Sequence, residues 1–414
     1  MLKNSFFLIP ALTAQPVLSQ NVKQEVVNYQ YIQLPMSPVD KSISNYQSKI
    51  TASYIEENNR KTAEYESEKA LAQEEYDQKM AAYPAAVAAA DAAFANEMKA
   101  YNEKSLAEKV VEKQLLNENT KPVKRVPPRP YLRTVAKPKL KKTYDFEALA
   151  GTYLNIDGFE NATGNAINVD VTINGFEYTK PVRKSEKKKY ISNGTTSYKT
   201  YYWNEMTYRH TMSVRVTDPS GNQLMFVTPS ELNNYTTYKT KSSEKTVAIN
   251  EEQLVSDLEQ KILQSNLEFI QNLVNDEVGY KRTDRKGSSF YVKEKKGEYT
   301  DILVAYNEST SGLKMLVDNE EAAKSEISRA LVAYENALLE AEPNNKKARI
   351  GKKVTLPLYF SMIECYWAIG NMDRVDELMN ELNTMPLVRR DKTKKEEYQA
   401  LIADTKARLK ANGL

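Results

Sequence analysis

The chain has 414 residues, and its 58 Lys and Arg against 55 Asp and Glu give a net charge of +3. This length accommodates two or three domains, and the near balance of charge argues against a nucleic-acid-binding protein. The composition includes 27 Tyr but a single cysteine, Cys365. Disulfides within the chain are therefore excluded, and we predict that Cys365 is a core thiol. The tyrosine excess is typical of half-exposed sheet faces and interfaces.

The first residues have the pattern of an export signal. Lys3 precedes an apolar run over residues 6–14, and small residues followed by Gln occur at 13–15 and 18–20. The run is too short to span a bilayer, and no later segment reaches the ~20 apolar residues of a transmembrane helix. No cysteine lies near the cleavage region to carry a lipid anchor. We therefore predict a signal peptide over 1–19 and an exported, non-lipidated protein without a transmembrane helix.

The segment 20–55 contains two candidate strands, at 26–34 and 46–55, and Pro35 ends the first. Two short strands are not stable alone. We expect them to pair with a β-domain formed later in the chain, so that the intervening segment is an insertion.

That intervening segment, 56–120, is predicted to be a long helical arm, because residues 54–119 contain no Gly and one Pro, Pro84. A continuous helix would be roughly 90–100 Å long. Pro84 either kinks a single rod or separates the two helices of a hairpin, and the lack of Gly or Asn beside it favours the rod. Apolar residues recur at helical spacing along the arm: Tyr76, Met80, Tyr83, Val87, Ala90, Phe94, Met98 and Tyr101. This seam has Tyr and Ala where a dimeric coiled coil favours Leu and Ile, so self-association stays open.

A basic, Pro-rich linker follows at 121–143. Between 121 and 142 it has nine Lys or Arg, five Pro and no acid. Such a segment favours an extended polyproline conformation. It is either a stiff strap returning along the helix or a contact for an anionic surface such as lipid head groups. Nucleic acid is not expected to bind here, since Tyr131 is the linker's one aromatic residue.

The segment 144–249 is predicted to be an antiparallel, sandwich-like β-domain. Apolar and polar residues alternate at 169–173 and at 212–216, and the second run ends in a turn at 218–221. Between these strands, 184–208 has several lysines followed by tyrosines and a tryptophan. This stretch either binds a glycan or an anionic polymer, or forms a hairpin whose lysines protect its edge.

A helix begins after Asn250, with Gln253 three residues later as in a capping box, and a short strand is expected at 290–292 within the segment 250–297. The remaining chain, 298–414, is helical and resembles tetratricopeptide repeats over about a quarter of the sequence. The best copy runs from Tyr359 to Leu382, with Gly370 at its turn. An incomplete copy precedes it: Ala330, Tyr334, Ala337 and Pro343. The resemblance implies stacked helix pairs with a concave protein-binding face.

No catalytic signature is found. The single histidine, His210, has no second His or Cys with which to hold zinc, and phosphate-binding Gly-rich loops are missing. Polar residues at 155–161 only faintly resemble a calcium loop. We therefore predict a non-enzymatic protein without a cofactor or metal. The fold class that follows is α+β: an antiparallel β-domain, a long inserted helix or helical hairpin, and a C-terminal tetratricopeptide-like array.

The whole pattern resembles exported accessory proteins of the Bacteroidota, on the signal followed by Gln, the strand at 28–35, the Tyr- and Lys-rich β-domain and the repeat-like end. This resemblance implies a periplasmic or outer-membrane-associated subunit of an envelope assembly that serves secretion or surface-protein biogenesis. We expect a scaffold or adaptor with other envelope proteins as partners; the alternative is a module that binds glycan or anionic lipid. The candidate partner-binding residues are Tyr76, Tyr83, Phe94, Tyr101, Arg125, Arg129, Arg133, Lys188, Tyr201 and Trp203.

Overall fold

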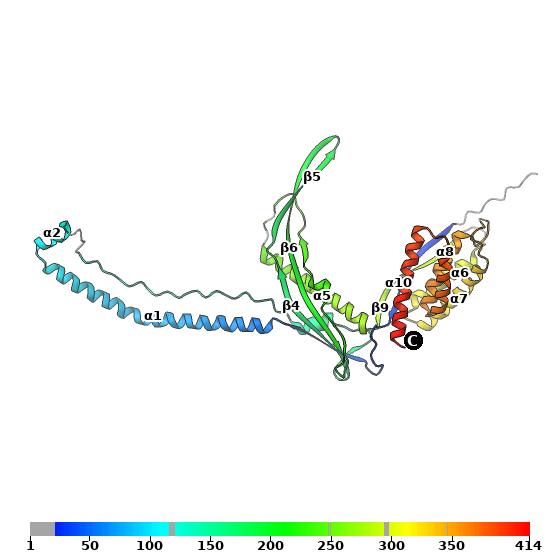
Figure 1. Cartoon of the computed structure of the whole chain (residues 1–414), viewed down its shortest axis with the longest axis horizontal. Helices are drawn as coiled ribbons and strands as arrows, with labels where there is room; N and C mark the ends of the chain where they lie inside the picture. Colours follow the sequence, from blue (N-terminus) through cyan, green and yellow to red (C-terminus); the bar gives the residue numbers. More distant parts are fainter. Residues whose placement is uncertain (1–20, 116–120, 247, 249, 294–297, 346) are drawn as a thin grey trace, which may run out of the picture.

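The structure is a computed structural model that describes residues 21–115, 121–246, 248, 250–293, 298–345 and 347–414. The predicted signal peptide, 1–19, lies outside the described residues. The described chain is mixed α and β, which confirms the predicted fold class at that level. A sheet body and a helical body lie next to each other, and a long helix and a long β-hairpin project from the sheet body (Figure 1).

The sheet body contains seven strands arranged around β6 (Thr195–Thr217). β4 and β5 pair in succession along one edge of β6, and β7 and β8 pair along the other. β2 joins β4 and runs parallel to it, so the sheet is mixed and not purely antiparallel as predicted. The other strands are β2 (Asn45–Ala52), β3 (Glu160–Asn161), β4 (Ala166–Tyr178), β5 (Val182–Ser192), β7 (Gln223–Val227) and β8 (Thr236–Lys239).

Helices cover the buried face of this sheet. Alternate residues of β4, from Ile167 to Ile173, are almost fully buried against α3 (Phe146–Tyr153) and α5 (Glu251–Val278). The side chain of Asn250 accepts a hydrogen bond from the Gln253 amide and so caps α5 at the predicted residue. The predicted sandwich is therefore wrong for the described residues: the apolar stripe of α5 occupies the position that a second sheet would take.

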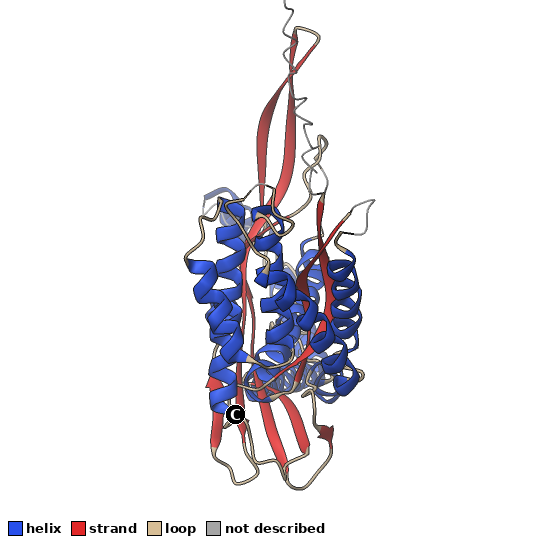
Figure 2. Ribbon diagram, turned by 90° about the vertical axis from the view of Figure 1, so that its right-hand side faces the viewer, coloured by secondary structure: helices blue, strands red, loops and turns tan. Residues whose placement is uncertain are grey.

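The hairpin extends the sheet well beyond this core. At about 3.3 Å per residue the 23-residue β6 is roughly 75 Å long. Asn193 and Gly194 connect β5 to β6 with positive φ angles of 48° and 75°, which is the backbone of a tight hairpin turn. β5 is exposed throughout its length, and the hairpin tip projects away from both bodies (Figures 1 and 2).

The arm is α1 (Ile55–Glu103), which continues through Pro84, so it is a rod and not a hairpin at that residue. Its 49 residues make a helix of about 70 Å, shorter than expected, because Ser105 begins a second helix, α2 (Leu106–Leu115). Ser105 and Glu108 form a capping box in which each side chain binds the other's backbone amide. The arm is inserted between β2 and β4, two paired strands of one sheet.

The helical body is built on a two-stranded ribbon of β1 (Val22–Gln33) and β9 (Lys281–Val292), which pair antiparallel along their whole lengths. β1 therefore does not pair with the β-domain as predicted. Its partner is nine residues longer than the expected strand at 290–292, since the polar sequence of 281–289 has no clear alternation. Five helices accompany the ribbon: α6 (Thr300–Met315), α7 (Glu320–Leu339), α8 (Lys352–Ala368), α9 (Met372–Asn383) and α10 (Arg389–Ala411).

The helix pairs α6–α7 and α8–α9 pack on the β1–β9 ribbon, and not on the β-domain as expected. Gly370 has a φ of 82° at the predicted turn between α8 and α9, a conformation that favours glycine. Cys365 is free and fully buried in this core, which confirms the prediction of a core thiol. The resemblance to tetratricopeptide repeats stays a prediction.

The C-terminal end of α10 joins the two bodies. Arg408 is buried and donates to the backbone carbonyls of Leu34 and Asp276 and to the Asp276 carboxylate. Asn412 donates to the carbonyl of Pro35 at 2.8 Å. These bonds tie the helical body to the end of β1 and to the last turn of α5.

Candidate functional site

The apolar seam of the arm is covered by the chain's own linker. From 121 to 142 the chain runs back along α1 as an extended strap (Figure 1). Lys124 pairs with Asp91 at 2.6 Å, the Tyr83 hydroxyl donates to the Pro127 carbonyl at 3.3 Å, and Arg133 lies 3.9 Å from Glu75. As the strap continues from Lys124 to Arg133, its partners on α1 move back from Asp91 to Glu75, so the strap runs antiparallel to α1. Four strap prolines are half-buried: Pro122, Pro127, Pro130 and Pro138.

At the base of the arm, where α1 leaves the sheet, the start of the helix is hydrogen-bonded to the end of the strap. The side chain of Asn58 donates to the carbonyl of Lys141 and accepts from its amide, at 2.8 and 3.1 Å. The Tyr54 hydroxyl donates to the carbonyl of Lys142 at 2.7 Å. Both ends of the insertion are thus bonded to each other, which fixes the direction in which the arm projects.

These contacts decide what the predicted arm residues do within the chain. Tyr76, Tyr83, Phe94 and Tyr101 are all half-buried on the seam, at the spacing that the sequence predicts. The exposed surface of α1 is rich in Glu, Lys and Gln before residue 80 and consists mostly of alanine between residues 81 and 95. The strap arginines Arg125, Arg129 and Arg133 are all exposed, and Arg133 also lies near Glu75 of α1. Partner contact by these residues stays a prediction.

The two faces of the β5–β6 hairpin differ in charge. Lys188, Tyr201 and Trp203 lie on one face, since residues two apart along a strand share a face. Tyr201 donates to Glu244 at 3.1 Å, and Trp203 donates to Glu205 at 3.2 Å. Acids therefore accompany the aromatic residues here: Glu186, Glu205 and Glu244.

The opposite face of the hairpin has no acid between residues 182 and 205. Its cations are Arg183, Lys187 and Lys189, and Tyr198 and Tyr202 lie between them on β6. The Lys187 ammonium is 4.8 Å from the centre of the Tyr198 ring. Both faces of the hairpin therefore have three cations with aromatic residues between them, but only the face opposite the candidate residues Lys188, Tyr201 and Trp203 has a net positive charge that no acid offsets. The sequence alone could have distinguished the two faces, because side chains alternate between faces along each strand and the Asn-Gly turn sets which residues of β5 and β6 lie opposite each other.

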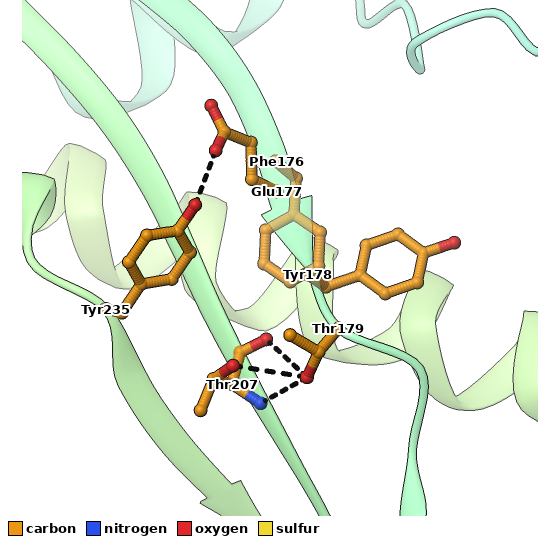
Figure 3. A pocket seen from close by; sticks show the side chains of 6 residues that line it. All are labelled: Phe176, Glu177, Tyr178, Thr179, Thr207 and Tyr235. Atoms are coloured by element: carbon orange, nitrogen blue, oxygen red, sulfur yellow. Dashed lines mark hydrogen bonds between the residues drawn. The ribbon is translucent and has the colours of Figure 1, made fainter.

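A shallow hollow lies where β4 and β8 flank β6, with a volume of about 610 Å³ (Figure 3). Glu177 accepts two bonds from Arg209, at 2.9 and 3.1 Å, and one from the Tyr235 hydroxyl at 2.9 Å. The Tyr235 and Arg209 bonds lower the pKa of Glu177. A carboxylate held by three donors is a poor general base, so the hollow supplies a binding surface and no evident acid–base chemistry.

His210 is buried on the other face of this sheet, edge-on to Phe176 at 5.7 Å. Burial lowers the pKa of His210 to about 4. Neither ring nitrogen has a hydrogen-bond partner in the described part of the chain. A Ser-His-Asp arrangement needs an acid and a hydroxyl on opposite sides of the ring, and the described residues do not provide them there.

The densest buried polar cluster lies in the helical body around Glu364, which is fully buried. Tyr29 and Tyr398 donate to it through their hydroxyls, and Arg285 donates through two nitrogens. Burial, followed by the charge of Glu364, raises the pKa of both tyrosines. Both carboxylate oxygens are occupied, so the cluster fastens the β1–β9 ribbon to α8 and α10 and has no free lone pair directed at a substrate.

No group of three or more metal-binding side chains occurs among the described residues. The faint calcium loop at 155–161 is held by Asn275, whose side chain accepts from the Asp157 amide at 2.6 Å and donates to the Asn155 carbonyl at 2.7 Å. This loop thus connects the sheet to α5.

None of the described helices combines the length and the apolar character that a transmembrane span requires. No protein-family model, curated protein or solved structure matches the chain.

Proposed function

We propose that the protein is a non-enzymatic scaffold or adaptor subunit of a bacterial cell-envelope assembly, exported to the periplasm or the outer membrane and serving secretion or surface-protein biogenesis. One observation carries the proposal: α1 projects about 70 Å from the sheet, while its apolar seam is covered by its own strap. A free amphipathic helix of this length would seek a partner helix to bury that seam. The braced arm instead keeps its shape alone and places its exposed faces and tip at a fixed distance from the body.

The fastening at Tyr54 and Asn58 supports this role. Because both ends of the arm are bonded at one point of the sheet, a load on the tip is transmitted to β2 and β4. The junction at Arg408 then links the sheet body to the helical body. An adaptor needs such continuity between its contact surfaces, and other envelope proteins are the partners that we propose.

Site-specific photo-crosslinking in cells tests the scaffold. A crosslinking residue is placed at exposed arm positions, Leu71 or Glu97, and at the strap-facing position Val87 as the matched control. We expect the exposed positions to capture an envelope protein and Val87 to crosslink to the strap of its own chain. Recovery of the chain in the cytoplasmic fraction, or no capture along 60–115, would contradict the proposal.

The acid-free face of the hairpin favours a second candidate function, binding of glycan or anionic lipid. Its test compares two double variants of equal charge: Lys187→Glu with Lys189→Glu on the acid-free face, and Lys184→Glu with Lys188→Glu on the other. Co-sedimentation with phosphatidylglycerol vesicles or with purified envelope glycan is measured. If the acid-free face binds, the first pair abolishes sedimentation and the second reduces it only slightly. Equal losses would indicate nonspecific attraction.

A further inference from the structure

Two hollows adjoin on the helical body, and together we call them the α8–α10 groove. The larger, about 770 Å³, lies between the ribbon and the start of α10; the smaller, about 570 Å³, lies between the start of β1 and the start of α8. Gln24 and Arg390 line both hollows, and Arg390 donates to the Gln24 side chain at 3.0 Å. The two hollows are therefore one elongated depression across the ribbon and the two helix starts.

The groove is strongly basic in a chain whose net charge is only +3. Seven cations line it against three acids, Glu25, Asp391 and Glu397. The seven cations are Lys23, Lys286, Lys352, Lys353, Arg389, Arg390 and Lys394. The first six form no ion pair with any described residue, and Lys394 is half-buried and donates to the Ser288 hydroxyl. By contrast, Arg329, Arg349 and Arg374 on the same body are all paired with acids.

Four of these cations stand where helix electrostatics disfavours them. Lys352 and Lys353 occupy the first turn of α8, and Arg389 and Arg390 that of α10. A helix N-terminus has a partial positive charge, so a cation in the first turn is electrostatically disfavoured. The N-cap residues Gly351 and Val388 supply no side-chain acceptor, and Asp391 of α10 is the one acid in these two first turns. These positive charges repel one another within one depression, and an anion that binds there relieves the repulsion.

The groove also has apolar lining. Val26 is 65% exposed on the ribbon, and Leu356 and Pro357 line the smaller hollow. A small inorganic anion would leave this surface uncovered. A flat bilayer would not reach into a depression bordered by a ribbon and two helix starts. A polypeptide segment that alternates acidic and aliphatic side chains satisfies both the charge and the apolar surface.

We propose that the α8–α10 groove binds an acidic peptide segment of a partner protein, with carboxylates on the first-turn cations of α8 and α10 and aliphatic side chains against Val26 in the larger hollow and Leu356 in the smaller one. The site lies on the ribbon and the helix starts, at a distance from the arm. It goes beyond the proposed scaffold function and requires neither the arm nor an envelope location.

Fluorescence anisotropy of the full chain with a labelled peptide of repeated Glu-Glu-Leu units, about twelve residues long, tests the proposal. The test variant reverses Lys352, Lys353, Arg389 and Arg390 to Glu. These substitutions put acids at helix N-termini, so the variant is expected to fold, as circular dichroism checks. The control variant reverses to Glu the same number of exposed cations outside the groove: Lys261, Lys314, Lys324 and Lys347.

We expect saturable binding that falls at least tenfold in the groove variant, changes less than about twofold in the control, and weakens as salt rises from about 50 to 300 mM. A Gln-Gln-Leu peptide of the same length should not bind. Equal loss in both variants would overturn the proposal, because it would show a nonspecific charge effect. So would the absence of peptide binding together with groove-dependent binding to phosphatidylglycerol vesicles, which would assign the groove to lipid.

Discussion

Arg285 and Glu364 form a two-pronged ion pair inside the helical body, with guanidinium–carboxylate distances of 2.5 and 2.8 Å. Arg285 comes from β9 and Glu364 from α8, and the guanidinium also lies 4.8 Å from the centre of the Trp367 ring. Because Tyr29 and Tyr398 add their hydroxyls to the same carboxylate, one buried charge joins both strands of the ribbon to two helices.

Removing that charge should be costly. Glu364→Gln leaves the Arg285 guanidinium buried without its counterion, and such losses typically cost about 3–5 kcal/mol. Urea unfolding followed by tryptophan fluorescence measures the change. Glu320→Gln is the control: its pair with Lys324 is exposed and should contribute less than about 0.5 kcal/mol. Similar effects from both substitutions would show that the cluster does not hold the ribbon in place.

Gly287 allows the ribbon to approach this cluster. A Cβ on Gly287 would lie 2.7 Å from the Tyr29 ring and 3.0 Å from the Glu364 carboxyl carbon. We expect Gly287→Ala to lower the free energy of unfolding by about 1–3 kcal/mol. Gly151→Ala is the opposite case, since nothing lies within 4 Å of its Cβ position in α3. That substitution should stabilise the protein by roughly 0.5–1 kcal/mol. A Gly287 variant as stable as the natural chain would contradict the close approach.

The strap should stabilise the arm. Tyr83→Ala with Phe94→Ala removes two half-buried rings from the seam, so the strap loses part of its surface on α1. We expect amide hydrogen exchange between residues 76 and 101 to rise about tenfold, which corresponds to ~1.4 kcal/mol. Leu71→Ala, at a 52% exposed position on the same helix, is the control and should leave exchange unchanged. Unchanged exchange in the double variant would mean that α1 is stable without its strap.

The single histidine should make the sheet body sensitive to acid. His210 stays neutral in the folded chain down to a pKa of about 4, whereas the unfolded chain takes up its proton near pH 6.5. The unfolded state therefore binds more protons between these values, and the stability contributed by neutral His210 is lost as the pH falls through that window, on the order of 2–3 kcal/mol. Urea unfolding at about pH 7 and pH 4.5 measures the loss.

The matching variant is His210→Phe, which keeps an aromatic ring beside Phe176. It should remove most of the difference between the two pH values while retaining the stability measured near pH 7. A His210→Phe chain that loses as much stability on acidification as the natural chain would assign the sensitivity to carboxylates.

Local periodicity accounts for the features that the sequence predicted well. Between residues 76 and 101 the half-buried positions of α1 coincide with the predicted seam, and Asn250 caps α5, because both depend on residues within one or two helical turns. β9 was missed over 281–289 because a polar strand between helices has no local signature. The buried ion pair of Glu364 and Arg285 also has no local signature, since one acid among 55 cannot be identified as a buried partner without knowing which distant residues surround it.

The sequence by itself determined the inserted arm, the proline-rich return, the alternating strands and the absence of a recognisable catalytic motif, because each is written in residue spacing and composition. Only the tertiary structure decided that β1 pairs with β9 across some 250 residues, that the strap covers the seam, and that a helix covers the sheet. These long-range contacts form only when distant parts of the chain come together, and their free energy depends on residues that are far apart in the sequence.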